Sequence, residues 1–525
     1  MDSGEQARLA RLDQAGASRL LGDSLIGVEK ESLRVAPDGR IAQTPHPRSL
    51  GSALTHPSIT TDYSEALLEL ITPPFPAPDP AHGYLLDLHG FVYRHLGEEI
   101  LWAASMPCVL DGEASIPIAY YGTSNAGRMK HVYRRGLGYR YGRTMQVIAG
   151  VHFNFSLSEA LWTLLHELEG GNRSRQDFVN AGYFAMIRNL LRMGWVVPYL
   201  FGASPAVCRS FFGGKPDKLE AFDQHTRFLP YATSLRVSDI GYQNRKEKRG
   251  GLQVCYDSLE KYVESLRWAI ETPHPDYQAI GVELNGEWRQ LNANVLQIEN
   301  EYYSSIRPKQ PFGIMEKPST AMRQRGVRYV ELRSLDLDPY DPAGVAEAAL
   351  HFLGAFLTHC ALCDSPPIDA GERVAIDYNL ELVATAGRRP GLELQRRGAG
   401  QVLLATWARE ILEAMAPLCE LLDAAGGSGS YGAALRLQRQ RVDDPDATPS
   451  ARVLAEMRSQ GEGFFEYAMR ISRAHAETLR HRELHRELAL ELAAEAERSL
   501  ARQGAMERAD ELSFEEFLQR YFASS

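Results

Sequence analysis

The sequence predicts an α+β fold, because strands and helices interleave along most of the chain without a strict β–α–β alternation. Residues 27–35, 150–157 and 327–337 alternate polar and apolar side chains with the period of two that is typical of strands. Residues 81–96 and 256–270 instead repeat apolar side chains every three to four positions, as amphipathic helices do. This pattern favours α+β over a doubly wound parallel sheet.

The two ends of the chain are predicted to be helical. Residues 3–21 have the pattern of an amphipathic helix, which Gly22 ends before the first strand. From about Gly400 onward the pattern is helical throughout, with a flexible turn at residues 426–430. No internal repeat is visible, which argues against solenoids and propellers. We therefore expect a single domain over residues 1–525, in which residues 400–525 form a mainly helical subregion.

The composition argues against a nucleic-acid or membrane partner. The formal net charge of -10 does not suit phosphate binding, which needs clustered Lys and Arg. One basic run, residues 245–249, is short and is expected to be an exposed loop. The first residues lack the apolar centre of a secretory signal. The longest apolar run, residues 348–363, contains two histidines and falls short of the ~20 residues that a membrane span needs. We expect a cytoplasmic protein.

The cysteines and two late histidines give weak indications of a metal site. Six cysteines in so long a chain do not predict a disulfide framework. Cys360 and Cys363 form one CxxC pair in an apolar run, and such a lone pair more often marks small core residues than metal ligands. His481 and His485 lie four apart on a predicted helix, a spacing that can bind Zn²⁺. The surrounding Arg and Glu residues favour an exposed, ion-paired helix instead.

The stretch GVEKESLRV, residues 27–35, places two carboxylates on one face of a predicted strand. Glu29 and Glu31 project to the same side, roughly 6 to 7 Å apart, because side chains alternate along a strand. Such a pair is consistent with a solvated edge strand that forms salt bridges. Taken alone, the stretch favours the solvated strand over the alternative, a surface that binds metal ions. Repetition of the pattern on other strands decides between the two interpretations.

Other predicted strands do repeat the pattern. In VHFNFS, His152 shares a face with Asn154, and in YVELRSL, Glu331 shares a face with Arg333. If these strands are neighbours, one surface gathers Glu29, Glu31, Asp62, Glu69, His152 and Glu331. Gathered carboxylates repel one another unless cations neutralise them, and Mg²⁺ or Mn²⁺ with oxygen ligands would do so. Mg²⁺ commonly bridges carboxylates to phosphates, and no P-loop or GxGxxG motif is present. The pattern therefore predicts a metal–nucleotide enzyme that lacks both motifs.

These residues lie within long blocks that resemble one known family. The blocks include GVEKESLRVAPDGR, GSALTHPSITTDYSEALLELITP, YYGTSNAGRMKHVYRRGL, GVHFNFSL, LPYATSLRVSDIGY, NANVLQIENEYYSSIRPK and YVELRSLDLDP. In this order they resemble the proteobacterial type of glutamate–cysteine ligase, up to about Gly400. The resemblance implies the fold of the glutamine synthetase and guanido kinase superfamily. That fold has a curved, mainly antiparallel sheet, with helices on its convex face and metals and ATP on its concave face.

The resemblance also implies roles for individual residues. The six residues gathered above match the family's ligands for two or three Mg²⁺ ions. Arg134 and Arg333 match the arginines that hold the transferring phosphate. The pocket for cysteine matches Tyr63, Tyr133, Arg236, Tyr242 and Tyr303. Position 63 departs from the family pattern, which has Phe there, so this wall of the pocket gains a hydroxyl.

The reaction implied is ATP-dependent ligation of glutamate to cysteine through γ-glutamyl phosphate, which is the first step of glutathione biosynthesis. The expected partners are therefore the small molecules glutamate, cysteine and ATP, and the resemblance suggests a monomer. One alternative is a related carboxylate–amine ligase that uses another amine. A second is a non-catalytic metal or nucleotide sensor. Loss of Glu69, Glu331 or Arg333 would favour the sensor, and all three are present.

Overall fold

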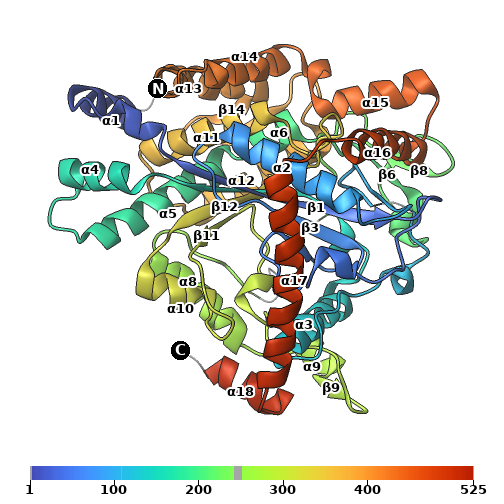
Figure 1. The fold of residues 1–525 in the computed structure, drawn as a ribbon. Helices are drawn as coiled ribbons and strands as arrows, with labels where there is room; N and C mark the ends of the chain where they lie inside the picture. Colours follow the sequence, from blue (N-terminus) through green and yellow to red (C-terminus); the bar gives the residue numbers. More distant parts are fainter. Residues whose placement is uncertain (1–2, 108, 242–250, 524–525) are drawn as a thin grey trace.

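The computed structural model describes residues 3–107, 109–241 and 251–523, and its centre is a seven-stranded sheet (Figure 1). Every pairing within this sheet is antiparallel. The strand order is β11 (Ile306–Lys309), β12 (Tyr329–Leu335), β5 (Val151–Ser156), β1 (Leu25–Val35), β3 (Leu67–Ile71) and β2 (Ile59–Thr61), with β4 (Ile100–Leu101) paired to β1. A mixed fold with an antiparallel sheet, as the sequence predicted, is therefore present.

The long strand β1 lies inside the sheet and sets the register of its neighbours. Glu29 pairs with His152 on β5, and Glu31 pairs with Glu69 on β3. The strands predicted at residues 27–35, 150–157 and 327–337 correspond to β1, β5 and β12, so these predictions are confirmed. This register brings the polar residues of three strands, which are far apart in the sequence, onto one face.

Helices cover the apolar face of the sheet. Helices α2 (Pro78–Tyr93) and α11 (Glu347–Leu362) pack against β1 and β5, and nearly every residue of α11 is buried. Helices α13 (Leu404–Gly426) and α14 (Ser430–Asp443) form a further layer outside α11 (Figure 1). The predicted helices 81–96 and 256–270 correspond to α2 and to α8 (Leu259–Glu271). Helix α2 begins earlier than predicted because Pro78, with its fixed φ, fits the first helical turn.

The N-terminal helix is shorter than predicted. The expected helix 3–21 is divided into α1 (Ser3–Gln14) and a short 3₁₀ helix, Ser18–Leu21. Gly16 between them has a φ of +62°, a left-handed conformation that ends the α-helix at low cost only for glycine. Helix α1 packs against α11.

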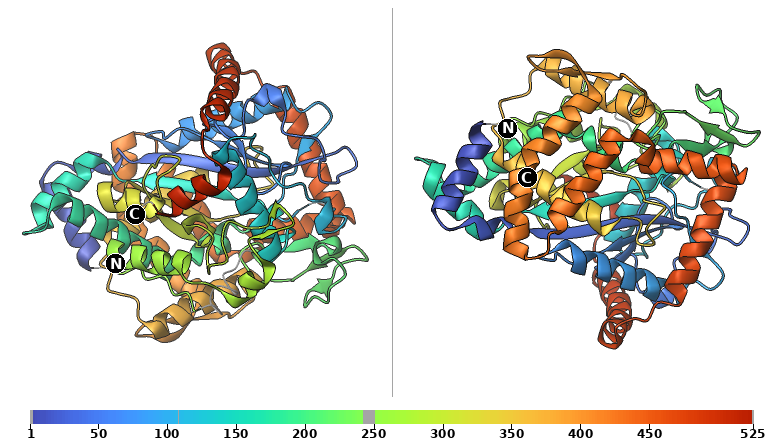
Figure 2. Two further views of the ribbon diagram at one scale, coloured as in Figure 1. Left: turned by 90° about the horizontal axis from the view of Figure 1, so that it is seen from below. Right: turned by 90° about the horizontal axis from the view of Figure 1, so that it is seen from above.

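The C-terminal part is mainly helical, as predicted, although a hairpin formed by β13 (Glu393–Arg396) and β14 (Gly400–Leu403) precedes it. After α13 and α14 come α15 (Pro449–Gln460), α16 (Phe464–Arg480), α17 (Arg486–Ala509) and α18 (Phe514–Ala523). Helix α17 crosses the front of the molecule in Figure 1, and the views in Figure 2 show it projecting from one side. It leads to α18, which packs against α3 (Asn125–Tyr141).

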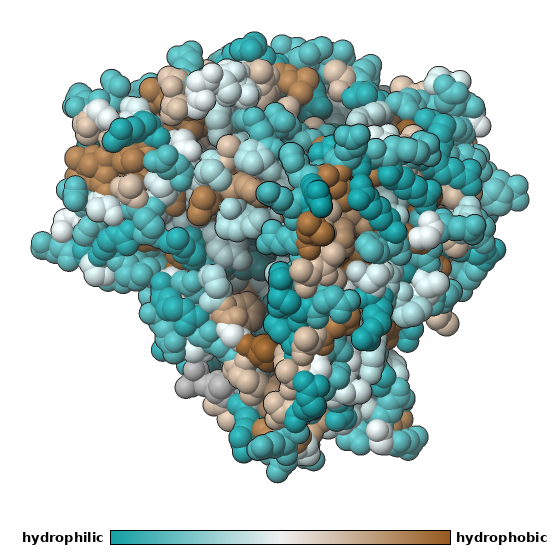
Figure 3. Space-filling model, viewed as in Figure 1, coloured by the Kyte–Doolittle hydropathy of each residue, from teal (hydrophilic) through white to brown (hydrophobic). Residues whose placement is uncertain are grey.

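The remaining elements surround this framework. They are α4 (Glu159–Glu169), α5 (Arg175–Met193), α6 (Val196–Phe201), α9 (Pro275–Ile280), α10 (Pro318–Arg325), α12 (Ala370–Ala386), and the strands β6 (Ala206–Cys208), β7 (Glu220–Ala221), β8 (Thr226–Phe228), β9 (Glu283–Leu284) and β10 (Glu287–Trp288). Hydrophilic residues dominate the face of the molecule seen in Figure 3. Among the described residues, no helix has the length and apolar character that crossing a membrane requires.

Candidate active site

The polar face of the sheet gathers four glutamates around one imidazole. The Nδ1 atom of His152 lies 3.2 Å from Oε2 of Glu29 and 3.6 Å from Oε1 of Glu331, and Nε2 lies 3.7 Å from Oε1 of Glu31. Ligand atoms of Glu29, His152 and Glu331 lie within 4.8 Å of one another, and so do those of Glu31, Glu69 and His152. These five side chains therefore have the spacing to hold hard divalent cations between them.

Two of these glutamates are stabilised as anions by neighbouring side chains. Burial opposes the ionisation of Glu331, but Lys309 and Arg333 outweigh it and hold its pKa well below the usual range. The Lys309 ammonium lies 3.1 Å from Oε2 of Glu331, and Nη1 of Arg333 donates a hydrogen bond of 2.9 Å to Oε1. Burial and the charge of Glu331 also oppose ionisation of Glu29, yet His152 lowers the pKa of Glu29. The charges of Glu29 and Glu331 are therefore balanced by side chains of the protein itself.

The charges of the other two glutamates, Glu69 and Glu31, are balanced less well. Burial, together with the charges of Glu29 and Asp62, raises the pKa of Glu69 well above its usual value. Burial likewise raises the pKa of Glu31. Because both carboxyl groups resist ionisation in the protein alone, a bound cation would favour their charged forms. The oxygen-rich donor set with one imidazole fits Mg²⁺ or Mn²⁺.

Asp62 and Arg134 lie at the edge of this face. Asp62 follows β2, and its Oδ1 lies 3.8 Å from Nη2 of Arg134 on α3. The Nε–H of Arg134 donates to the Asp62 carbonyl oxygen, and its guanidinium carbon stands 4.7 Å from the centre of the Tyr121 ring. The guanidinium is thus held toward the acidic face from the opposite side to Arg333.

Arg333 lies at an irregularity in its strand. Between Leu332 and Leu335 the register of β12 against β5 shifts by one residue, which is a β-bulge. A bulge redirects the side chains beside it and is common next to active sites. The Arg333 guanidinium bonds Glu331 two positions earlier on the same strand, and it also lines the adjoining pocket.

That pocket, of about 110 Å³, adjoins the acidic face and brings together most of the predicted substrate residues. Its lining includes Glu31, Asp62, Tyr63, Tyr133, Arg134, His152, Arg236, Asn300, Glu301, Tyr303, Arg307 and Arg333. Tyr242, which was predicted for the same pocket, lies outside the described residues. The predicted residues for phosphate and for cysteine therefore face one cavity, and their individual roles remain predictions.

Arg236 is buried and is connected to Arg333. Its Nη2 donates a hydrogen bond of 2.8 Å to the Arg333 carbonyl oxygen, and Nη1 lies 4.0 Å from Oδ1 of Asp336. Gly150 leaves room for this guanidinium, because a Cβ atom there would lie 2.0 Å from Nη2. Arg236 thus connects the predicted cysteine pocket to the strand that carries Arg333 and Glu331.

The sequence interpretation missed two cations on the edge strand β11. Lys309 pairs with Glu331, and Arg307 lines the pocket while donating to the carbonyl oxygens of Asn300 and Tyr302. The pattern in IRPK contains the clue, because Arg307 and Lys309 lie two positions apart and so share a face of a strand. The intervening Pro308 hides this pattern, because proline is rare inside strands.

The weaker metal candidates have different outcomes. The prediction that His481 and His485 lie on one helix is wrong. Helix α16 ends at Arg480 and α17 begins at Arg486, so both histidines lie between the two helices. Cys360 belongs to the hydrophobic core, as expected for the CxxC pair. Cys363 is also buried, and it contacts Glu5 and His359.

The fold and the site together define a class: a protein whose antiparallel sheet carries, on its polar face, a donor set suited to divalent cations and, beside it, arginines suited to anionic substrates. The comparison with protein families specifies it, since the model described as glutamate–cysteine ligase matches residues 9–383. The glutamate–cysteine ligase of Pseudomonas aeruginosa is 51% identical over 517 residues, which cover 98% of this chain and 97% of that protein. The one from Pseudomonas entomophila is 50% identical over 515 residues, covering 98% and 97% respectively. The chain belongs to the glutamate–cysteine ligase family.

Solved structures agree with this assignment. A crystal structure of glutamate–cysteine ligase from Francisella tularensis in complex with AMP has a TM-score of 0.88 and 36% identity, and the match covers 96% of this chain and 98% of that one. A bifunctional glutathione synthetase from Pasteurella multocida has a TM-score of 0.71 and 27% identity, over 90% of this chain and 55% of the longer protein. The resemblance found in the sequence motifs is confirmed.

Proposed function

We propose that the protein joins the γ-carboxylate of L-glutamate to the amine of L-cysteine at the expense of ATP. The γ-carboxylate attacks the γ-phosphate of ATP and releases ADP, and the cysteine amine then displaces phosphate from γ-glutamyl phosphate to give γ-glutamylcysteine. The observation that carries the proposal is the single cavity in which Glu31, Asp62 and His152 of the acidic face meet Arg134 and Arg333. Family membership over nearly the whole chain supports it.

The acidic face would serve as the metal site of this reaction. Glu29, Glu31, Asp62, Glu69, His152 and Glu331 would share two or three Mg²⁺ ions, or Mn²⁺. Such ions supply charge neutralisation for the phosphates of ATP. The raised pKa values of Glu69 and Glu31 support this role, because the cations near these two carboxyl groups do not outweigh the effect of burial. The AMP bound to the Francisella tularensis relative supports the use of an adenine nucleotide.

The arginines and tyrosines would serve different half-reactions, either phosphoryl transfer or the binding of cysteine. Arg333 and Arg134 would bind the transferring phosphate with planar, bidentate donor groups. Arg236 and the rings of Tyr63, Tyr133 and Tyr303, with Tyr242, would receive cysteine, whose thiol forms only weak hydrogen bonds and so is selected mainly by shape. We further infer that the sheet has the curved form of the glutamine synthetase and guanido kinase superfamily, and that the protein acts as a monomer.

The test is to follow the half-reactions separately. Phosphate release from ATP is measured with glutamate, with and without cysteine, and the acyl phosphate is trapped with hydroxylamine in the absence of cysteine. A panel of amines that includes cysteine and 2-aminobutyrate distinguishes this ligase from one that couples another amine. Absence of glutamate-dependent phosphate release under all these conditions would favour a non-catalytic sensor.

Two arginine variants place the residues within the reaction. Arg333→Ala should suppress trapping at any cysteine concentration. Arg236→Ala should raise the cysteine requirement by a factor of roughly ten to a hundred and fifty, since one charge-assisted contact contributes about 1.5 to 3 kcal/mol. Because Arg236 also bonds the Arg333 carbonyl, Tyr303→Phe is the milder companion variant, and it should leave trapping unchanged. If Arg236→Ala abolishes trapping while its apparent cysteine affinity stays normal, the pocket has been assigned to the wrong substrate.

A further inference from the structure

A second cluster of metal-ligand side chains lies between α1 and α11, apart from the acidic face. Glu5 of α1 is fully buried, and His359 and Cys363 lie four residues apart at the C-terminal end of α11. Oε1 of Glu5 lies 2.7 Å from Nδ1 of His359, and Oε2 lies 3.9 Å from Sγ of Cys363. The sulfur is 3.7 Å from each nitrogen of the His359 ring.

Carboxylate, imidazole and thiolate are the donor types that Zn²⁺ prefers. With zinc bonds of about 2.0 to 2.3 Å, a tetrahedral site separates its donor atoms by roughly 3.3 to 3.6 Å. The sulfur–nitrogen and sulfur–oxygen separations are already close to this range. To admit the ion, the contact between Glu5 and His359 must lengthen by about half an ångström, and the Cys363 side chain must turn toward the lone pair of the ligating nitrogen.

The cluster is also accessible. His359 and Cys363 line a surface pocket of about 620 Å³, so an ion can reach them without unfolding of the core. The nearby carboxylate of Asp364 lies in the same pocket, but it pairs with Arg8 at 3.0 Å. A water molecule from the pocket is therefore the natural fourth ligand.

A nucleophilic cysteine is the competing interpretation of these three side chains. In such a triad the thiol must align with the lone pair of one imidazole nitrogen, which then acts as its base. The Cys363 sulfur is instead equidistant from both nitrogens of His359, so it is aligned with neither. In a triad the carboxylate and the thiol also lie on opposite sides of the imidazole, whereas here Oε2 of Glu5 is 3.9 Å from the Cys363 sulfur, so the three donors converge on one point, which favours shared coordination of an ion.

We propose that Glu5, His359 and Cys363 bind a zinc ion that fastens the N-terminal helix α1 to the core helix α11. This site is distinct from the proposed magnesium site. Its thiolate selects a soft ion, whereas the acidic face offers carboxylates and one imidazole. Its role is to hold α1 in place, so bound zinc should raise the thermal stability of the protein.

Cobalt substitution tests the proposal, because a thiolate bound to Co²⁺ gives a near-ultraviolet charge-transfer band that carboxylates do not give. The full-length protein is stripped with a chelator and titrated with Co²⁺ and then with Zn²⁺, in excess Mg²⁺ to occupy the acidic face. We expect one equivalent of Co²⁺ with the band, displacement by Zn²⁺, and a melting temperature that rises with Zn²⁺ concentration. Absence of the band in the wild-type protein would overturn the proposal.

Single variants assign the band to its ligands. Cys363→Ser should abolish it, and Glu5→Gln should weaken Zn²⁺ binding by roughly tenfold or more. The matched control is Cys255→Ser, because Cys255 is the most exposed of the other cysteines that the structure describes. Cys255→Ser should keep the band and the zinc affinity of the wild type. If Cys363→Ser keeps the band, or Cys255→Ser loses it, the thiolate has been assigned wrongly. If Cys363→Ser fails to fold, the effect of Glu5→Gln on Zn²⁺ affinity decides.

Discussion

The two faces of β1 both bury charged groups, but they accommodate them in opposite ways. On one face Glu29 and Glu31 meet other carboxylates around His152. On the other face, Lys30 is almost fully buried, and its Nζ lies 3.0 Å from Nε2 of His89 and donates to the Ser32 hydroxyl. Glu29 and Glu31 thus lie among other carboxylates, whereas Lys30 between them lies beside an imidazole and a hydroxyl group.

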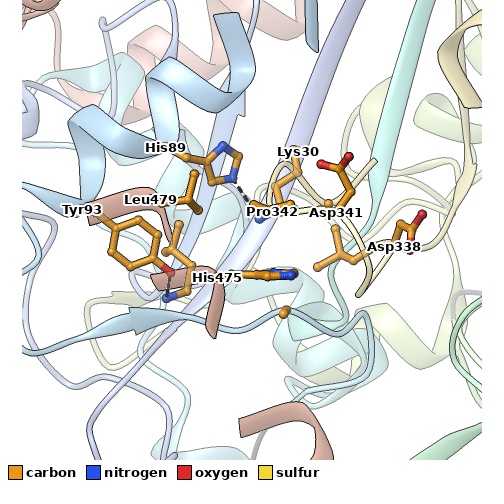
Figure 4. Close-up of a pocket in the computed structure, with 12 residues that line it drawn as sticks. Lys30, His89, Tyr93, Asp338, Asp341, Pro342, His475 and Leu479 are labelled. Atoms are coloured by element: carbon orange, nitrogen blue, oxygen red, sulfur yellow. Dashed lines mark hydrogen bonds between the residues drawn. The ribbon is translucent and has the colours of Figure 1, made fainter. Parts of the chain in front are cut away.

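The lysine side contains few charges. Figure 4 shows Lys30, His89 and His475 converging beside Tyr93, with Asp338 and Asp341 at the edge of the cluster. Burial lowers the pKa of Lys30 to about 7 and that of His475 to about 4, and it holds the pKa of His89 well below its usual range. The cavity beside Lys30, of about 10 Å³, has room for about one water molecule.

The difference shows which face is built to bind ligands. Because the pKa of Lys30 is lowered to about 7, the lysine face can lose its charge at small cost near neutral pH and needs no ligand for that. The acidic face keeps several carboxylates in contact and leaves Glu69 and Glu31 with raised pKa values, so it gains from a bound cation. Substitutions on the two faces should therefore affect different properties.

The largest effect is expected from the acidic face. Glu29→Gln keeps the shape of the side chain but removes a charge, so Mg²⁺–ATP binding should weaken and turnover should fall by about a hundredfold or more. The control is Glu393→Gln on the hairpin strand β13, where the glutamate is exposed. Initial rates against Mg²⁺ concentration give the measurement, and equal turnover of Glu29→Gln and the wild type at limiting Mg²⁺ would contradict the metal assignment.

The next effect concerns stability on the lysine face. The pKa of Lys30 is about 7 in the folded protein and 10.5 for a free side chain, so between these values the unfolded chain binds more protons. Stability due to Lys30 therefore rises with pH across this window, by up to about 1.4 kcal/mol per pH unit. Lys30→Met should be more stable than the wild type near pH 7, and the difference should shrink toward pH 10.

Denaturant unfolding of both proteins at several pH values measures this difference. His89, His475, Asp338 and Asp341 surround the lysine and remain in the variant, so their contributions largely cancel in the comparison. A stability difference that stays constant from pH 7 to pH 10 would show that Lys30 keeps an ordinary pKa, and the contrast between the two faces would fail.

The smallest effect is expected from Glu69, whose contribution to stability changes with pH in the opposite direction. The pKa of Glu69 is raised above 4.5, so the folded protein binds more protons than the unfolded chain above that pH, and stability due to Glu69 falls as pH rises. Because Glu69 is only half-buried, Glu69→Gln should stabilise the metal-free protein at neutral pH by about 1 kcal/mol. Thermal unfolding with and without Mg²⁺ checks this. A gain that persists in saturating Mg²⁺ would mean that the cation does not neutralise Glu69.

Part of this arrangement could be predicted from sequence because strands have a period of two. That period alone places Glu29 with Glu31 and Glu331 with Arg333. It could not supply the register, in which Glu31 faces Glu69 and Glu29 faces His152, because pairing between distant strands depends on the whole sheet. The family resemblance of the motifs, rather than local periodicity, indicated that these residues lie together.

Other features had no local pattern to reveal them. Lys30 lies between the two glutamates of β1, but its partner His89 is 59 residues away on α2. Glu5 contacts His359 across 354 residues, so neither end of the CxxC run indicated the cluster at Cys363. The bulge at Arg333 is likewise a property of two paired strands and not of one.

The contact between α18 and α3 has a consequence for how the chain is made. Phe514, Phe517 and Leu518 form a small separate core with Val132 of α3, the helix that also carries Arg134. The bond from Asn125 to the Leu512 carbonyl oxygen spans 387 residues of sequence. At about 5 to 20 residues per second, a ribosome needs roughly 20 to 80 s to add that length. During that interval the apolar residues of α3 that pack against α18 are exposed. The nascent chain must therefore avoid aggregation through this surface until α18 has been synthesised.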